Sequence, residues 1–233
     1  MIDRELNYGR HIIKDYLYKS MPYRSVLDIG AGSGADLDIA REINPTSTIS
    51  AIECYGPSAQ VLKNKSICVE EINIENDIYP FADSSIDVII ANQILEHTKE
   101  LFWIFHQISR MLPIGGKLII GVPNLASLHN RILLLLGQQP TSIQINSAHI
   151  RGYTLEDTIK FLNSCFPGGY ELMSRRGSNF YPFPSLIARP LAQVFPSAAW
   201  GMFLLLKKTR NYDSEFLQFP RKADLQTNFY LGL

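Results

Sequence analysis

Three glycines at alternate positions, Gly30, Gly32 and Gly34, form the part of the sequence best suited to hold a ligand. They follow a short apolar run that contains Asp28. Glycine lets the backbone turn sharply and approach a ligand closely, and the helix start beyond the turn offers unpaired N–H groups. This pattern predicts a nucleotide-like cofactor beside the turn. Residues 30–35 also fit a dinucleotide fingerprint, G-x-G-x-x-A, and a purely structural turn is the third alternative.

Two further side chains offer chemistry that such a cofactor site needs. Glu53 stands at the end of the second expected strand, where a carboxylate can accept both hydroxyls of a ribose. His97 follows the fourth expected strand and could take a proton from a hydroxyl, since an unperturbed histidine has a pKa of about 6.5. The competing interpretations are a solvent-exposed acid for Glu53 and a locally packed helix-start residue for His97.

The first half of the chain alternates short strands with helices, and these elements must position the candidate residues. Strands are expected at 25–29, 48–53, 66–74, 86–91 and 117–122, and helices at 8–18, 36–43, 57–64 and 99–111. Such an alternation predicts βαβ units around a parallel sheet. Ligands of these sheets bind outside the carboxyl ends of the strands, which is where the glycine turn, Glu53 and His97 lie.

Beyond Val122 the pattern is looser. The expected elements are an amphipathic helix at 125–136, a polar loop at 138–150, a helix at 154–164, and strands at 171–176 and 200–207. Thr154, with Asp157 three residues later, is typical of a capped helix start. The Pro-rich segment 181–184 predicts a rigid connection before the last strand.

No repeat, low-complexity stretch or strong linker marks a second domain. We therefore expect one domain over residues 1–209, with a lid-like insertion at about 124–153. The tail at 210–233 shows no clear element. The apolar run 125–136 and the aromatic run 180–183 are expected to pack in the core or the lid. Covering a lipid-like substrate or touching a membrane is the alternative for these two runs.

Composition limits the classes of function. Lys and Arg total 22, as do Asp and Glu, so the formal net charge is zero and gives no sign of a nucleic-acid partner. Three widely spaced cysteines favour neither a disulfide framework nor a zinc site, and they suit a cytoplasmic protein. The charged N-terminus does not resemble a signal peptide. The aliphatic runs are much shorter than the roughly 20 apolar residues that cross a bilayer.

Four ordered motifs give the sequence a resemblance to class I S-adenosylmethionine (SAM)-dependent methyltransferases. The first is the strand and glycine turn at 26–34. The second, over 80–97, is Pro-Phe-x-Asp-x-x-hydrophobic-Asp, an apolar strand and Leu-Glu-His. The third, over 110–124, is Arg-hydrophobic-Leu-x-x-Gly-Gly and a strand ending in Val-Pro-Asn. The fourth, His-x-Arg-x-Tyr-Thr at 149–154, resembles a bacterial subgroup often associated with cell-surface polysaccharide or lipid-linked glycan pathways.

The resemblance covers roughly residues 7–207 and implies a Rossmann-like α/β fold. That fold is a doubly wound, mostly parallel seven-stranded sheet with an antiparallel last strand and helices on both faces. It also implies SAM as the cofactor, with an N-terminal helix, bearing Tyr8 and Arg10, that often covers it. The residues that the resemblance assigns to SAM binding are Asp28, Gly30, Ala31, Gly32, Gly34, Glu53, Asn73, Ile74 and Asn92.

Each part of the cofactor has its expected contacts under this resemblance. Asp28 would orient the turn and the amino-acid end of SAM, and Glu53 would bind the ribose. The family usually places an acidic residue near the adenine amino group. Asn73 stands there in this sequence and would accept through its side-chain carbonyl, while Ile74 would pack against the ring. The backbone at Asn92 and Gln93 would contact the amino group of the cofactor.

His97 and His149 are the expected catalytic residues. His149 lies beyond the fifth strand, where this fold builds its substrate lid; a loop-anchoring role is the alternative. Related quinone O-methyltransferases carry Glu-x-x-Glu-His at the position where this chain has Gln93-Ile94-Leu95-Glu96-His97. Loss of the first carboxylate weakens a site for a hard cation, because such ions prefer carboxylate oxygens. We therefore expect no metal.

The expected reaction is methyl transfer from SAM to a small-molecule acceptor, at a hydroxyl of a sugar, glycolipid or related metabolite. No Asn/Asp-Pro-Pro-Tyr/Phe motif follows the fourth strand, so nucleic acid is not the expected substrate. Methylation of carbon or nitrogen, a non-catalytic module that binds SAM or S-adenosylhomocysteine, and a NAD-dependent oxidoreductase are the alternatives. A homodimer and peripheral contact with a membrane stay open.

Overall fold

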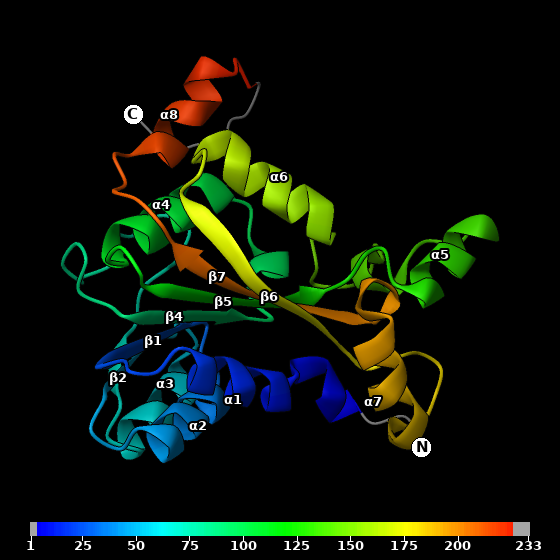
Figure 1. Ribbon diagram of the computed structural model, residues 1–233, viewed down its shortest axis with the longest axis horizontal. Coiled ribbons are helices and arrows are strands. Elements are labelled where there is room, and N and C mark those ends of the chain that lie inside the picture. The colour runs from blue at the N-terminus through cyan, green and yellow to red at the C-terminus, as the bar shows by residue number, and fades with distance from the viewer. Residues whose placement is uncertain (1–3, 226–233) are drawn as a thin grey trace.

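A computed structural model describes residues 4–225 and places a mixed sheet at the centre of the molecule (Figure 1). Within these residues the sheet has seven strands, in the order β3-β2-β1-β4-β5-β7-β6. The first five strands run parallel, whereas β7 is antiparallel to both β5 and β6. This confirms the doubly wound α/β fold. The strands are β1 (Ser25–Ile29), β2 (Thr48–Ile52), β3 (Cys68–Glu70), β4 (Val88–Asn92), β5 (Lys117–Pro123), β6 (Tyr170–Ser178) and β7 (Gly201–Lys208).

Helices cover both faces of the sheet (Figure 1). The lower face in that view carries α1 (Arg10–Lys19), α2 (Ala35–Ile43) and α3 (Gly56–Asn64). The upper face carries α4 (Leu101–Met111), α6 (Leu155–Cys165) and α8 (Glu215–Lys222). At the right-hand end lie α5 (Leu128–Leu135) and α7 (Ser185–Val194). Short 3-10 turns complete the described chain: η1 (Arg4–Tyr8), η2 (Leu95–His97), η3 (Thr141–Ile143) and η4 (Pro196–Ala198).

The central strand β4 shows how the sequence builds two cores. Ile89 and Ala91 belong to the cluster beneath α4 and α6, whereas Val88 and Ile90 belong to the cluster against α1 and α2. All four side chains are fully buried. A strand covered on both faces must be apolar at every position, which is why this run does not alternate with polar residues. The two cores fix the end of β4, where the candidate site begins.

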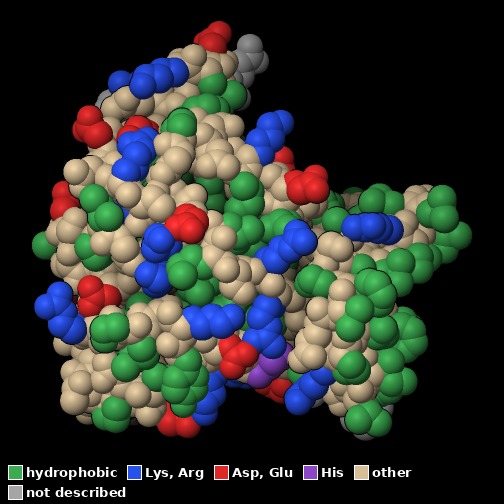
Figure 2. All heavy atoms as spheres, viewed as in Figure 1, with side chains coloured by type: hydrophobic (Ala, Val, Ile, Leu, Met, Phe, Trp, Pro, Cys, Tyr) green, Lys and Arg blue, Asp and Glu red, His purple; other side chains and the backbone are tan. Residues whose placement is uncertain are grey.

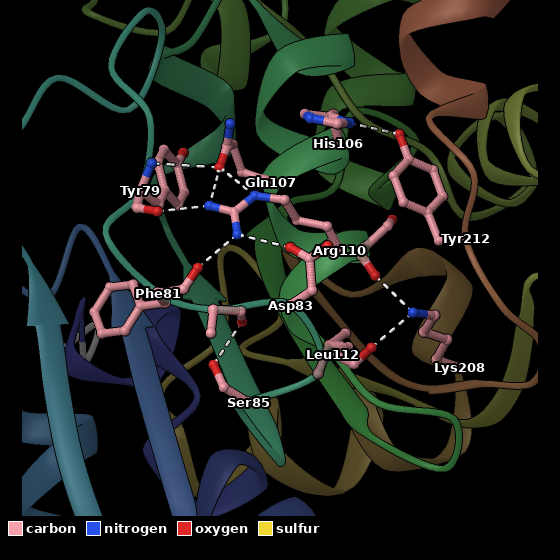
Figure 3. Close-up of polar contacts among 12 residues, drawn as sticks. Tyr79, Phe81, Asp83, Ser85, His106, Gln107, Arg110, Leu112, Lys208 and Tyr212 are labelled. Carbon is pink, nitrogen blue, oxygen red and sulfur yellow. Dashed lines mark hydrogen bonds and ion pairs between the residues drawn. The ribbon is translucent and has the colours of Figure 1, made fainter.

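Arg110, from the third sequence motif, ties α4 to the loop before β4 (Figure 3). Its guanidinium donates to the carbonyl oxygens of Tyr79 and Phe81, each at 2.5 Å, and to the Asp83 carboxylate at 3.1 Å. It also donates to the side-chain oxygen of Gln107 at 2.6 and 2.9 Å. Only a planar, forked donor can reach this many acceptors at once. The motif is therefore structural in this chain.

The carboxyl end of α4 is held by groups from the C-terminal part of the chain (Figure 3). Lys208 is 3% exposed, and its ammonium donates to the carbonyl oxygens of Ser109 and Leu112 at 2.7 and 2.6 Å. A cation is favourable there because the last carbonyls of a helix carry partial negative charge. His106 Nδ1 and the Tyr212 hydroxyl lie 2.9 Å apart.

Two elements differ from expectation in length or kind. The third strand was expected at 66–74 but spans only Cys68–Glu70, because the chain turns at Asn73, whose side-chain oxygen accepts the Glu75 N–H. The Pro-rich segment continues into α7, which the sequence did not predict. Ala188 and Ala192, four residues apart and buried, allow α7 to lie close to the sheet edge.

The expected tail also contains structure. Residues 215–222 form α8, whose Phe216 is fully buried in the cluster beneath α4 and α6. An amphipathic eight-residue helix flanked by polar segments is a weak signal in sequence. Residues 226–233 of the tail lie outside the described residues.

Candidate active site

The glycine-rich turn lies between β1 and α2, and its three glycines have positive φ angles: 72° at Gly30, 53° at Gly32 and 81° at Gly34. A Cβ atom at Gly30 would collide with Ile94, and one at Gly34 with Leu62. At Gly32 an added Cβ would meet nothing within 4 Å. The outer two glycines therefore pack the turn, whereas Gly32 faces open space that a ligand can approach.

A cavity of about 220 Å³ opens beside this turn. It is bounded by the turn, the end of β4 and the start of α1. The structure brings five of the expected cofactor residues to its wall, together with Tyr8 and Arg10. The lining residues are Tyr8, Arg10, Asp28, Gly30, Ala31, Gly32, Ser33, Ala35, Asp36, Asn92 and Gln93.

Four buried polar atoms at this cavity lack a hydrogen-bond partner among the described residues: Arg10 Nε, Asp36 Oδ1, Asn92 Oδ1 and Gln93 Nε2. A buried polar atom left without a partner costs about 1–3 kcal/mol, so a group of four indicates a polar ligand. The two oxygens can accept from an ammonium, and the two nitrogens can donate to a carboxylate. The amino-acid end of SAM carries both groups, so these residues fit that cofactor.

The buried acidic side chains of the cavity also favour SAM as the ligand. Asp28 is 3% exposed, and burial, followed by the charges of Asp36 and Glu53, raises its pKa well above the ordinary range. Burial also raises the pKa of Asp36, an effect that the Asn92 hydrogen bond and the Arg10 charge oppose. Two acids in one buried cavity favour a cationic ligand, because a cation relieves both the repulsion and the loss of solvent. SAM is such a ligand, since it carries a sulfonium and an ammonium.

Glu53 lies at the end of β2 and does not line the 220 Å³ cavity. Its Oε2 accepts the Gly32 N–H at 2.7 Å, and its Oε1 accepts the Tyr55 N–H at 2.8 Å. The carboxylate therefore holds the glycine turn in shape. A carboxylate has about four acceptor positions, so two remain for the ribose contact, which stays a prediction.

Asn73 and Ile74 lie in the loop after β3 and do not line this cavity either. Asn73 is exposed, and its side-chain oxygen accepts the Glu75 N–H at 2.9 Å. Ile74 packs against the cluster beneath α4, and its carbonyl accepts from the Tyr79 hydroxyl at 3.0 Å. The adenine contacts of both residues stay predictions.

Asp36 is the charged cavity residue that the sequence did not predict, whereas Gln93 was expected at the cofactor together with Asn92, through its backbone. Asp36 lies in the first turn of α2 and is 8% exposed; an acid directly after a glycine turn was the available signal. Gln93 has a φ of 56°, in a region that non-glycine residues seldom adopt and that often marks a functional site. The sequence does not indicate this positive φ angle at Gln93.

The two expected catalytic histidines meet beside Glu96, although they come from separate segments. Glu96 and His97 belong to η2, directly after β4, whereas His149 comes from the insertion. The Ile150 and Arg151 N–H groups donate to the Glu96 carbonyl at 2.9 and 3.3 Å, which docks the insertion on η2. The imidazole rings lie 4.7 Å apart, centroid to centroid, at an angle of 78°.

Hydrogen bonds fix the state of both rings. His97 Nδ1 lies 3.1 Å from the Ala148 carbonyl oxygen, and His149 Nδ1 lies 2.9 Å from the Ser142 carbonyl oxygen. A carbonyl only accepts, so each Nδ1 carries a hydrogen, and in the neutral ring Nε2 then holds the free lone pair. Burial lowers the pKa of His97, which favours the neutral ring. Glu96 is 1% exposed, its carboxylate oxygens have no hydrogen-bond partner within residues 4–225, and burial raises its pKa to about 8.

A second cavity, of about 270 Å³, lies at the carboxyl end of β5. Its wall combines the start of α6, two residues of β6, η4 and Arg131 of α5. The lining residues are Asn124, Ala126, Arg131, Thr154, Leu155, Glu156, Arg175, Arg176, Pro196, Ser197 and Met202. The segment 149–154 connects it to the histidine pair, because Thr154 lines the cavity and the hydroxyl of Tyr153 donates to the Leu95 carbonyl of η2 at 3.0 Å.

A family model described as a methyltransferase domain matches residues 7–163. The chain belongs to this family. Together with the glycine turn and its cavity, the match makes the protein a SAM-dependent methyltransferase, and the dinucleotide interpretation of residues 30–35 is not supported. The finer assignment to a subgroup related to quinone O-methyltransferases is not part of what this match shows.

Solved structures share the fold of this methyltransferase. A SAM-dependent methyltransferase from Archaeoglobus fulgidus is 16% identical, with a TM-score of 0.56 and coverage of 88% of this chain and 97% of the other. The 1,6-didemethyltoxoflavin N1-methyltransferase of Burkholderia thailandensis, solved with S-adenosylhomocysteine, is 14% identical, with a TM-score of 0.58 and coverage of 87% and 79%. The geranyl diphosphate C-methyltransferase of Streptomyces coelicolor is 13% identical, with a TM-score of 0.57 and coverage of 86% and 80%.

One curated relative is similar over part of the methyltransferase. A 37.1 kDa protein in transposon TN4556 of Streptomyces fradiae is 28% identical over 111 residues. The match covers 46% of this chain and 32% of the relative, so the chain matches about a third of that protein. Within the described residues, no helix of the methyltransferase is long and apolar enough to cross a membrane.

Proposed function

We propose that this methyltransferase transfers the methyl group of SAM to a hydroxyl of a small molecule of the sugar or glycolipid class. The observation that carries the proposal is the histidine pair. The Nδ1 atoms of His97 and His149 both face backbone carbonyls, which leaves Nε2 as the proton acceptor of each neutral ring, and His97 is four residues beyond Gln93 of the cofactor cavity. A hydroxyl is the acceptor that benefits from such a pair, because it must lose a proton as the methyl is transferred.

The residues of the chain divide the reaction between them. Bound SAM supplies an activated methyl group on a sulfonium. Asp36, Asn92 and Arg10 hold its amino-acid end, and the glycine turn fixes its position, so that positioning contributes much of the rate. Transfer to the acceptor oxygen would break the S–CH₃ bond and leave its electron pair on sulfur, so the residues of the chain need only hold the two reactants in line and remove the hydroxyl proton. The proton of the hydroxyl passes to His97 Nε2, directly or through a water, and then to solvent.

The 270 Å³ cavity supports an acceptor of moderate size with polar groups. Its wall contains Arg131, Arg175 and Glu156 beside the apolar Leu155 and Met202. Sugars combine hydroxyls, which use such charged and amide groups, with C–H faces that pack on apolar side chains. The segment 149–154 joins the two features, because it begins at His149 of the histidine pair and ends at Thr154 in the cavity wall.

The test is transfer of a radiolabelled methyl group from SAM to a panel of acceptors that contains sugars, glycolipids, phenols, amines and thiols. We expect transfer to hydroxyl acceptors, and a loss of about 10²–10⁴-fold in kcat for His97→Gln with SAM affinity within twofold of the parent. Transfer to amines or thiols alone would refute the proposal that a hydroxyl is the acceptor. Tight SAM binding without transfer to any acceptor would favour a non-catalytic SAM-binding module.

A further inference from the structure

The cluster of Glu96, His97 and His149 has the composition of a metal site. The side-chain donor atoms of the three residues all lie within 4.8 Å of one another. Ligands of a tetrahedral Zn²⁺ ion lie about 3.3 Å apart, given bonds of about 2.0–2.1 Å, so a side-chain movement of roughly 1.5 Å would close the site. His97 is exposed and His149 half-buried, so solvent reaches the cluster on the histidine side.

Glu96 gives the independent sign of a ligand. It is 1% exposed, yet neither carboxylate oxygen has a hydrogen-bond partner among the described residues. A buried carboxylate without a partner is expensive, and buried acids normally pair with a cation or coordinate a metal. Its neighbours in the cluster are the two imidazoles, whose Nδ1 atoms already bond to backbone carbonyls and are not available to it. A cation held jointly by the three residues would satisfy the carboxylate.

The hydrogen bonds of the two histidines orient their rings as those of metal ligands usually are. Metal-bound imidazoles usually donate their other ring N–H to a carbonyl or carboxylate, which fixes the tautomer and the ring orientation. Here the carbonyls of Ala148 and Ser142 accept from Nδ1 of His97 and His149. Both Nε2 lone pairs therefore stay free, in the cluster that contains the Glu96 carboxylate.

We propose that Glu96, His97 and His149 bind one divalent cation of the Zn²⁺, Fe²⁺ or Mn²⁺ type. Two nitrogens and one carboxylate favour these ions over Mg²⁺ or Ca²⁺, which prefer all-oxygen sites. The sequence expectation of no metal rested on Gln93 and did not include His149, which lies 52 residues after His97 in the chain. Three protein ligands leave at least one coordination position open, as in catalytic zinc sites.

For the proposed hydroxyl transfer, this cation would lower the pKa of an acceptor hydroxyl at the open position. With the cation bound, both Nε2 atoms are ligands and the hydroxyl proton would leave to solvent water, which replaces the direct transfer to His97 Nε2 in the metal-free site. This role rests on the proposed function, but the binding of the cation does not.

The experiment measures binding of Zn²⁺ to the full chain after removal of metal with a chelator, without SAM and without an acceptor. Calorimetry should show one site, and Co²⁺ in its place should give visible d–d absorption. We expect His149→Gln and Glu96→Gln each to weaken Zn²⁺ binding by at least 100-fold, whereas His129→Gln, outside the cluster, should leave it within twofold. Because Glu96 is buried, circular dichroism checks its variant, and the half-buried His149 provides the second one.

The outcomes separate the two proposals. Absence of stoichiometric Zn²⁺ binding, or binding that survives both substitutions, would overturn the metal site. Zn²⁺ binding lost in both variants establishes it, even if no hydroxyl acceptor is methylated. Hydroxyl methylation that continues at full rate in excess chelator would leave the proposed function intact and remove the cation from it.

A second, independent observation concerns the surface of α5 and α7. An amphipathic helix of a water-exposed protein buries its apolar face, but α5 buries only Asn130. That side chain bonds to Asn124, Thr141 and Ser142. We use the name apolar end for the exposed side chains of α5, α7 and their flanks. It comprises Leu128, Ile132, Leu134, Leu135, Leu136, Phe183, Leu186, Ile187, Val194 and Phe195.

The apolar end is continuous and strongly exposed. Leu135 is 86% exposed and Leu186 is 87% exposed. The rings of His129 and Tyr181, 5.7 Å apart, join α5 to the segment before α7. Figure 2 shows hydrophobic side chains gathered on the right of the molecule, over these two helices. Exposed apolar areas of this kind mark contact sites for proteins or membranes.

The charge distribution around the apolar end distinguishes between a protein and a membrane as its partner. The segments 124–155 and 172–212 contain none of the 22 acidic residues of the chain. They contain Arg131 and Arg189, on α5 and α7, both exposed. Apolar side chains flanked by basic ones, with no acid, are complementary to an anionic lipid surface. A symmetric contact with a second copy would instead set these arginines against each other without any acidic partner.

We infer that the apolar end docks on an anionic lipid bilayer, which would bring the second cavity, with Arg131 in its wall, next to lipid-linked acceptors. The full chain should float with vesicles containing about 30% phosphatidylglycerol and much less with phosphatidylcholine alone. Leu135→Glu combined with Leu186→Glu should reduce flotation at least tenfold. Ile78→Glu, at another exposed apolar residue (73% exposed), is the matched control and should leave it unchanged.

Light scattering and SAM binding accompany the flotation assay. We expect a monomer whose SAM affinity the paired substitutions leave unchanged. A dimer that the paired substitutions dissociate would overturn the bilayer in favour of a second copy, and equal flotation of the parent and the variant would overturn the apolar end as the contact. Neither readout depends on methyl transfer.

Discussion

The side-chain amide of Asn92 donates to the carboxylate of Asp36 at 2.7 Å and to the Tyr8 carbonyl oxygen at 3.0 Å. One side chain thus joins the end of β4, the start of α2 and the segment before α1. The second oxygen of Asp36 and the side-chain oxygen of Asn92 are buried and have no hydrogen-bond partner in the described part of the chain. The two residues therefore present a pre-formed pair of acceptors to the cofactor cavity.

Replacing Asp36 tests this pair. Asp36→Asn removes the charge that attracts an ammonium, and we expect SAM to bind about 10–100-fold more weakly, since a hydrogen bond to a charged group contributes about 1.5–3 kcal/mol. Calorimetry with SAM and S-adenosylhomocysteine measures the change. Asp38→Asn, on the same helix and in a surface ion pair with Lys65, is the control. Equal losses in the two variants would contradict the assigned contact.

The pKa of Asp28 predicts opposite effects of pH on stability and on binding. Its folded pKa is raised above the ordinary 3.8, so its contribution to stability is complete below that pH and is lost as the pH rises through the folded value. Asp28→Asn should therefore raise the melting temperature at pH 8 but not at pH 4. The same variant should bind SAM more weakly at pH 8. A melting temperature unchanged at pH 8 would show that ionisation of Asp28 has no cost.

Gly32 allows a test of close approach by the cofactor without disturbing the packing. Gly32→Ala introduces a Cβ into open space, at a φ of 53°. Gly168→Ala does the same at a φ of 64°, far from the cavity in sequence, so both variants carry similar backbone strain of about 1–2 kcal/mol. We expect similar losses of stability in denaturant titrations, but at least a tenfold loss of SAM affinity only for Gly32→Ala. Parent-like affinity in that variant would place the cofactor elsewhere.

His106 predicts acid sensitivity of the fold. Burial, assisted by the Arg110 charge, lowers its pKa from 6.5 to about 4. Between pH 6.5 and pH 4 the histidine is therefore protonated in the unfolded chain but neutral in the folded chain. Stability should therefore fall as the pH decreases from about 6.5 to about 4, by about 1–2 kcal/mol after allowance for the part of the ring that solvent screens. His106→Gln should flatten this part of the curve in urea titrations. His129→Gln is the control and should keep the slope.

Arg110→Lys tests the structural interpretation of the third motif. Lysine cannot reach the acceptors around Tyr79, Phe81 and Asp83 at once, so several acceptors lose their donor. We expect a loss of about 2–3 kcal/mol in the free energy of unfolding. Arg24→Lys, at a side chain that is 95% exposed, should change it by less than about 0.5 kcal/mol. A catalytic role for Arg110 would instead lower kcat without lowering stability.

The sequence predicts what depends on local patterns. Strand and helix alternation, the glycine turn and the Thr154 cap, which accepts from the Asp157 N–H, are confirmed because each is determined within a few residues. Prediction from the sequence failed where tertiary contacts determine the structure. The helix α7 is an example, because it depends on Ala188 and Ala192 fitting a neighbouring surface. The meeting of His97 and His149 is of the same kind. Both were expected in the site, but only the fold brings their rings together beside Glu96.

The docking of the insertion on η2 has a consequence for how such a chain can change in evolution. The cofactor cavity is built from residues 8–93, whereas His149 and much of the second cavity come from segments after β5. The insertion meets η2 through backbone hydrogen bonds to the Glu96 carbonyl and through the Tyr153 hydroxyl, which donates to the Leu95 carbonyl. Residue changes within 124–153 can therefore alter His149 and the part of the second cavity formed by Asn124, Ala126 and Arg131, while the residues that line the cofactor cavity stay the same.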